Sequence, residues 1–115
     1  MKNSFLALSL FILTTCTASI AQETTATKCN PTELDIDVYA KPNFDDFEYA
    51  NGSLKSNECY TMKIDHHVGS YKISKGSQIT FFPERRCKGK AVYSGKESNA
   101  KTDFTARSFK ITCYN

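Results

Sequence analysis

The sequence predicts an all-β domain built from two paired Greek-key motifs. Short segments alternate apolar and polar residues with a period of two, which is typical of half-buried strands. No stretch sustains the 3.6-residue apolar period that a long helix requires. A duplication of about 40 residues, with four strands in each copy, accounts for the pairing of two such motifs.

Strands are expected in both halves of the chain, and two are especially clear. Residues 34–39 alternate apolar and acidic side chains, and residues 77–82 show a similar alternation. Shorter runs predict the remaining strands at residues 47–49, 60–64 and 91–93.

Turns are expected where glycine follows a small polar residue. Asn51-Gly52 and Ser94-Gly95 each come directly after or close behind an expected strand, and such pairs favour tight turns. Residues 102–107 are expected to form one short turn. The two dipeptides would then close one hairpin in each half of the domain.

Three matches in the same order define the duplication. Residues 70–73 (Ser-Tyr-Lys-Ile) match residues 108–111 (Ser-Phe-Lys-Ile), and residues 39–46 align with residues 82–89. The two turn pairs then fall in register. We infer a first motif at about residues 34–74 and a second at about residues 77–115.

This pattern resembles the Greek-key motif of the βγ-crystallins over about residues 34–114, nearly the whole mature chain. The motif is an aromatic residue, four residues, a second aromatic, one residue and Gly, followed later by a Ser that opens a final strand. The matching positions are Tyr39, Phe44, Asp46 and Ser70 in the first copy, and Phe82, Gly89 and Ser108 in the second. Asp46 stands where the family has Gly, and Cys87 stands where it has the second aromatic.

The resemblance implies a specific architecture. Two four-stranded sheets would pack as a sandwich, with each motif lending one strand to the other's sheet. Gly89 would adopt a positive φ, and Asp46 would tolerate the same conformation. Ser70 and Ser108 would brace the first hairpin of each motif.

The N-terminus is expected to be a signal peptide, residues 1–21. Lys2 precedes a nine-residue apolar run, which is far shorter than the roughly 20 residues needed to span a bilayer. Small residues at Ser19 and Ala21 predict cleavage after Ala21. Residues 22–33 are then expected to be a flexible leader, and the mature protein to be secreted and monomeric, not an integral membrane protein.

Four cysteines remain after cleavage, which predicts two disulfides in a small extracellular domain. They are Cys29, Cys59, Cys87 and Cys113. The sequence by itself allows three pairings. The resemblance implies Cys59–Cys113, because the third strand of the first motif would lie beside the last strand of the second, and it leaves Cys29–Cys87.

Charge is unevenly distributed. Residues 22–69 carry a net charge of −5 and residues 70–115 a net charge of +7. The densest basic segment contains Arg85, Arg86, Lys88 and Lys90, on the turn of the second motif's first hairpin. Arginine offers a planar fork that suits phosphate and carboxylate, so these side chains are a candidate contact surface, alongside the alternative of a solvated loop or a dibasic processing site.

Metal and cofactor sites are not expected. Many βγ-crystallins bind Ca²⁺, and Asp65 and Asp103 occupy the first position of the corresponding stretches. His66 or Phe104 follows them, and Gly69 or Arg107 takes a position that would need an oxygen ligand. The adjacent His66 and His67 should point to opposite faces of a strand, one packed and one exposed, and so cannot chelate one ion.

No catalytic motif is found, so the protein is expected not to be an enzyme. Asn51-Gly52-Ser53 is a candidate N-glycosylation sequon at an expected hairpin tip. Small secreted relatives in the resembling family include antimicrobial proteins, killer toxins and a metalloproteinase inhibitor.

The leading interpretation is a non-catalytic secreted protein that acts at the anionic surface of another cell. The alternatives are an extracellular structural or stress protein and a protease inhibitor. The partner would be such a surface or another secreted protein, with no role for nucleic acid.

Overall fold

The computed structural model describes residues 28–114, and these form one β domain. The expected signal peptide and residues 22–27 of the expected leader lie outside the described residues. The strands are β1 (Leu34–Lys41), β2 (Asp45–Leu54), β3 (Cys59–Val68), β4 (Ser70–Ile73), β5 (Ser77–Phe82), β6 (Tyr93–Lys96) and β7 (Phe104–Cys113), with one short 3-10 helix, η2 (Arg85–Cys87), between β5 and β6.

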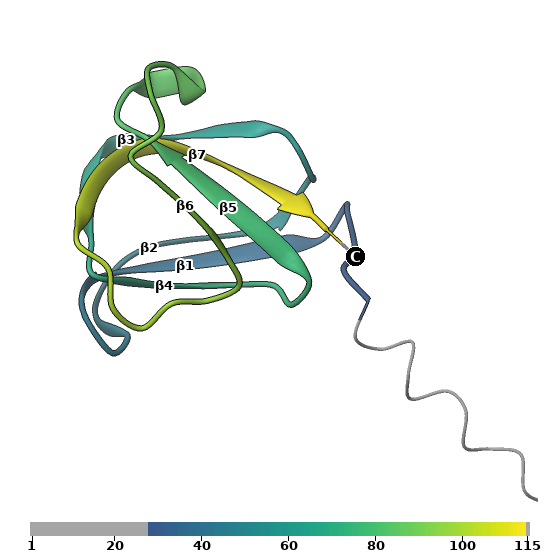
Figure 1. Ribbon diagram of the computed structural model, residues 1–115, viewed down its shortest axis with the longest axis horizontal. Coiled ribbons are helices and arrows are strands. Elements are labelled where there is room, and N and C mark those ends of the chain that lie inside the picture. The colour runs from purple at the N-terminus through teal and green to yellow at the C-terminus, as the bar shows by residue number, and fades with distance from the viewer. Residues whose placement is uncertain (1–27, 115) are drawn as a thin grey trace, which may run out of the picture.

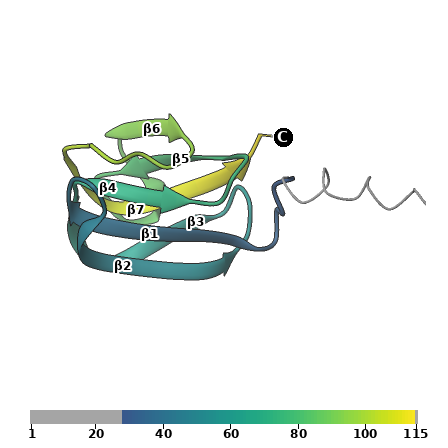
Figure 2. The same ribbon diagram turned by 90° about the horizontal axis from the view of Figure 1, so that it is seen from below.

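Two antiparallel sheets pack face to face, which confirms the all-β sandwich. One sheet has the order β2-β1-β4, and the other has the order β3-β7-β5-β6. Figure 1 shows the strands of the first sheet crossing below those of the second, and Figure 2 shows β1 and β2 on one side and β6 on the other. The short helix η2 projects beyond the end of β5 at the top of Figure 1, above β3 and β7.

One strand from the first half lies in the sheet of the second half. β3 pairs with β7, whereas its neighbours in sequence, β2 and β4, both pair with β1. From the second half, Asn99 forms an isolated bridge with Tyr71 of β4. The first sheet therefore has three strands and one bridge, not the four strands expected.

Alternating side chains fill the space between the sheets. In β1 the side chains of Leu34, Ile36 and Val38 are buried while Asp35 is exposed, as the period of two predicts. The expected strand at residues 77–82 coincides with β5. The buried apolar core comprises Leu34, Ile36, Val38, Leu54, Met62, Val68, Tyr71, Ile79, Phe81, Ala106, Phe109 and Ile111.

The two glycine dipeptides lie inside strands, so the turn predictions were wrong there. Asn51-Gly52 belongs to β2, where the pairing with β1 shifts register between Leu34 and Ile36, and the one extra residue on β2 forms a bulge. Ser94-Gly95 lies within β6 and pairs with β5. Residues 102–107 are not a turn either, because β7 begins at Phe104 and residues 104–106 pair with β3.

The disulfides are Cys29–Cys113 and Cys59–Cys87, so the pairing implied by the resemblance was wrong. β3 begins at Cys59 and β7 ends at Cys113, but the register places Lys110 opposite Cys59. Three strand residues separate Cys113 from that level, a distance of about 10 Å, which exceeds the reach of a disulfide. The Cα atoms are 5.7 Å apart in the Cys29–Cys113 bond and 6.0 Å apart in the Cys59–Cys87 bond.

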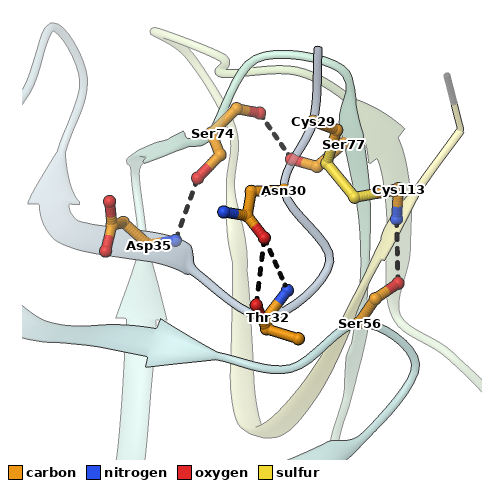
Figure 3. The surroundings of a disulfide bond; sticks show 8 residues. All are labelled: Cys29, Asn30, Thr32, Asp35, Ser56, Ser74, Ser77 and Cys113. Carbon is orange, nitrogen blue, oxygen red and sulfur yellow. Dashed lines mark hydrogen bonds between the residues drawn. A yellow bond between two sulfur atoms is a disulfide. The ribbon is translucent and has the colours of Figure 1, made fainter.

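The Cys29–Cys113 disulfide joins the start of the described chain to its end (Figure 3). Nearby serines hold the adjoining backbone: Cys113 N donates to Ser56 Oγ over 3.0 Å, and Asp35 N donates to Ser74 Oγ over 2.9 Å. Residues 28–33, which belong to the expected leader, are thus tied to the domain through Cys29. Two disulfides are compatible with an extracellular protein.

Candidate functional site

Two corners of the sandwich are similarly built, and the basic segment lies at the second of them, residues 82–89. This second corner runs from the end of β5 through η2 and turns back sharply, with φ angles of 59° at Arg86, 54° at Cys87 and 82° at Gly89. Arg86 N donates to Thr61 Oγ1 over 2.9 Å, and Cys87 is bonded to Cys59 on β3. The segment is therefore fastened to β3 at two consecutive residues.

A buried serine completes the fastening. Ser108 Oγ accepts a hydrogen bond from Cys87 N over 2.8 Å and donates one to the carbonyl oxygen of Glu84. The side chain of Ser108 is fully buried, so both bonds are shielded from water. One hydroxyl thus closes the loop at two points of its backbone.

The first corner, residues 39–46, repeats this arrangement. Ser70 Oγ accepts from Phe44 N over 2.9 Å and donates to the carbonyl oxygen of Lys41 over 2.7 Å. Asp46 has a φ of 64°, where the second corner has Gly89 at 82°. The braced residues of the two corners, Phe44 and Cys87, are those that the sequence alignment places opposite one another.

Two adjoining hollows lie between the second corner and β3. The larger has a volume of about 570 Å³ and the smaller about 400 Å³, and both are lined by Arg85, Arg86 and Arg107. Lys88 lines the larger and Lys63 the smaller. We call these five basic side chains and the hollows between them the basic groove. Its lining also holds two acids, Asp65 and Glu84, so positive charge prevails.

Arg107 is the fixed member of the basic groove. Its Nε donates to the carbonyl oxygen of Met62 over 2.8 Å, and its Nη2 donates to that of Lys63 over 2.7 Å. These bonds fill the gap in pairing between β3 and β7, where the register shifts between Thr61 and His66. Its Nη1 lies 3.8 Å from Asp65 Oδ1, an ion pair too long for a good hydrogen bond.

The basic groove differs from the contact surface expected from the sequence. Arg85, Arg86 and Lys88 line it, but Lys90 does not. Arg107 and Lys63 join it from β7 and β3. The sequence marks Arg107 only as a cation at a degenerate calcium position, and it carries no local signal for Lys63. Both residues reach the corner through the register of β3 on β7, which the sequence does not reveal.

At the first corner, the side chain of His67 lies between the corner backbone and Asp103. His67 Nδ1 lies 2.9 Å from the carbonyl oxygen of Ala40, and its Nε2 lies 2.8 Å from Asp103 Oδ1. A carbonyl and a carboxylate both accept, so the doubly protonated imidazolium satisfies both contacts. The hydrogen bond to Asp103, followed by that to Ala40, raises the pKa of His67 above its ordinary value of 6.5.

His66 points the other way, so the two histidines do lie on opposite faces of β3. Its side chain is buried, and Nδ1 lies 2.9 Å from Glu48 Oε1. Asp65 and Asp103 lie at different corners, each beside a basic side chain, Arg107 and His67 respectively. No group of three or more His, Cys, Asp or Glu that could hold a metal ion occurs among residues 28–114.

The glycosylation candidate Asn51 is exposed but lies within β2, not at a hairpin tip as expected. Its Nδ2 donates to Tyr49 Oη over 3.2 Å, and its Oδ1 accepts from Gly52 N over 2.9 Å. The side-chain amide therefore has local partners in the bulge of β2.

Comparison of the chain with protein-family models, with curated proteins and with solved structures finds no match. Within the described part of the chain, no helix is long and apolar enough to cross a membrane.

Proposed function

We propose that this is a secreted, non-catalytic, βγ-crystallin-like protein that binds the anionic surface of another cell in defence or competition. The resemblance in sequence suggests this class of protein, and the serine brace repeated at the two corners supports it. The residues that Ser70 binds at the first corner align in sequence with the residues that Ser108 binds at the second corner. Two disulfides fit an extracellular setting.

The observation that carries the proposal is the basic groove. Its arginines and lysines come from three segments that are distant in sequence, yet they line one pair of adjoining hollows. The loop that supplies three of them is fixed by the Cys59–Cys87 disulfide and by Ser108, so little conformational entropy is lost when a ligand binds. Positive charge concentrated in a concave surface favours anionic partners.

The test is binding to vesicles of phosphatidylglycerol and phosphatidylcholine at low and high salt, together with growth inhibition of yeast and bacteria. Replacing Arg85, Arg86, Lys88 and Lys90 with Gln should remove most of the binding to anionic vesicles. Binding by the wild type should weaken as salt rises, because screening shortens the range of the attraction.

The matched control replaces four lysines outside the loop, Lys72, Lys75, Lys96 and Lys101, with Gln. This control loses the same net charge but keeps the basic groove. Equal loss of binding in both variants would show attraction by net charge alone and would contradict the proposal. An absence of growth inhibition, with binding retained, would favour an extracellular structural role.

A further inference from the structure

We propose that the basic groove is a discrete site for a phosphate group, held by the guanidinium of Arg107 and by Arg85 and Arg86, with Asp65 as an internal competitor. This inference rests on the proposed function, because it names the chemical group that the groove would recognise on an anionic surface. It goes further in predicting a saturable site for the free anion.

The Arg107 guanidinium is held in place but incompletely paired. Its Nε and Nη2 each donate one hydrogen bond to a carbonyl oxygen, that of Met62 at 2.8 Å and that of Lys63 at 2.7 Å. These bonds hold the plane of the guanidinium in place without neutralising its charge. Among residues 28–114, the third nitrogen, Nη1, has only the distant Asp65 carboxylate at 3.8 Å, and the Arg107 side chain is 20% exposed. A fixed, incompletely paired cation thus faces the larger hollow.

Two further arginines line the same hollows from the second corner. Arg85 and Arg86 contribute to both hollows, and their backbone is pinned by the hydrogen bond from Arg86 N to Thr61 and by the neighbouring disulfide. Three arginines from two segments, η2 and β7, line these hollows, and guanidinium groups can donate to several oxygens at once. A tetrahedral phosphate supplies such acceptors in several directions, whereas a carboxylate supplies them in one plane.

Asp65 is the acidic partner of Arg107 in the basic groove. Its side chain is 63% exposed and meets Arg107 at a distance that gives a weak, screened ion pair. A phosphate entering the larger hollow would displace this carboxylate from Nη1. Removing the charge of Asp65 should therefore strengthen binding, which a purely structural role of Asp65 would not do.

The experiment is a titration of the purified full mature chain with inorganic phosphate at constant ionic strength, followed by NMR shifts of the Arg107 Nε–H and the backbone amides. The wild type should show saturable shifts confined to the second corner and β3. Acetate at the same concentration should give much smaller shifts.

Two variants sharpen the titration. Asp65→Asn should bind phosphate about threefold to fivefold more tightly, the range expected for loss of an exposed ion pair. Asp37→Asn makes the same change of charge on β1 of the other sheet and should leave the affinity nearly unchanged. Arg85→Gln combined with Arg86→Gln should weaken binding about tenfold or more, since charge-assisted hydrogen bonds are lost.

The outcomes separate this inference from the proposed function. Vesicles of phosphatidylglycerol, compared with vesicles given the same surface charge by a fatty acid, report whether the phosphate of a lipid headgroup is read at the same site. Binding to both kinds of vesicle without any phosphate site would keep the proposed function and overturn the inference. A phosphate site without binding to vesicles or cells would support the inference and contradict the proposed function. Equal tightening in Asp65→Asn and Asp37→Asn, or acetate binding as well as phosphate, would overturn the inference.

Discussion

The first corner (residues 39–46) and the second corner (residues 82–89) share a serine brace, but different side chains fill the space beside it. At the first corner the His67 imidazole bridges Ala40 and Asp103. At the second corner the corresponding pair, Pro83 and Asp65, lines the larger hollow of the basic groove together with arginines. The same backbone arrangement can therefore be closed by a local contact or left with a hollow beside it.

Two residues account for much of this difference. Gly69, which precedes Ser70, lies so close to the first corner that a Cβ atom there would be 2.5 Å from the carbonyl oxygen of Ala40. Arg107, which precedes Ser108, carries a long side chain that occupies the gap between β3 and β7. Absence of a side chain allows close approach at the first corner, whereas a charged side chain helps to form the groove at the second.

The largest difference between the corners should come from the Cys59–Cys87 disulfide. Replacing both cysteines with Ser should lower the free energy of unfolding by about 3.5 kcal/mol, from the loop entropy of a cross-link between residues 28 apart. Urea unfolding measures this loss. Hydrogen exchange should show faster opening of the second corner while the first keeps its protection.

The matched control for that experiment is the pair Cys29→Ser and Cys113→Ser. Its separation of 84 residues predicts a loss of about 4.5 kcal/mol, without selective opening of the second corner. Similar exchange at both corners in the Cys59–Cys87 variant would show that the disulfide is not a local fastening.

Gly69→Ala tests the close approach at the first corner. The new Cβ would meet the backbone of Ala40 and Lys41 at 2.5 to 2.6 Å, so the corner must shift, at a cost of about 2 to 3 kcal/mol. Gly52→Ala is the control, because its Cβ would meet only the exposed side chain of Asp35, which can rotate away. Thermal unfolding that leaves both variants equally stable would refute the argument from close packing.

Substitutions at the positive-φ positions of the two corners, Gly89 and Asp46, should have opposite effects on stability. Gly89→Ala should destabilise the protein by about 1 kcal/mol, because an L-residue with a φ of 82° is strained. Asp46→Gly should be neutral or slightly stabilising, since Asp46 already bears part of that strain at 64°. Chemical unfolding measures both, and a large loss in Asp46→Gly would reveal a contact of the carboxylate that outweighs the strain.

The pH dependence of stability should reside at the first corner. The pKa of His67 is raised in the folded state, so its contribution is complete below about pH 6.5 and is lost as the pH rises through the folded pKa. The His67 side chain is half-exposed, so the loss in the free energy of unfolding should stay below about 1 kcal/mol. His67→Gln should flatten the stability profile over that range, because it removes the group whose pKa is raised at the first corner. An unchanged slope in His67→Gln would assign the dependence to another group.

The smallest effect concerns calcium, and the expected value is zero. Replacing EDTA with millimolar CaCl₂ should leave the melting temperature unchanged, because a ligand that bound only the folded protein would raise it. His67 and Arg107 place basic groups beside Asp103 and Asp65. A rise of several degrees would show that one of the two corners still binds the ion.

Features that depend on residues close together in the sequence could be predicted from the sequence alone. The alternation in residues 34–39 and 77–82 identified β1 and β5, because burial of one face imposes a period of two on any strand. The alignment of the two motifs placed Ser70 and Ser108 at equivalent positions. Charge counting also found the basic segment of the second corner, since four basic residues fall within the six positions 85–90.

Features that depend on sheet register were decided by the tertiary structure. Asn51-Gly52 is a favourable turn by local preference, but pairing with β1 absorbs it as a bulge. The opposition of Cys59 and Lys110 rules out a Cys59–Cys113 bond, and no local pattern encodes that register. Arg107 and Lys63 join the arginines of the second corner because β3 crosses into the other sheet, and long-range pairing of this kind is set by the packing of the whole chain.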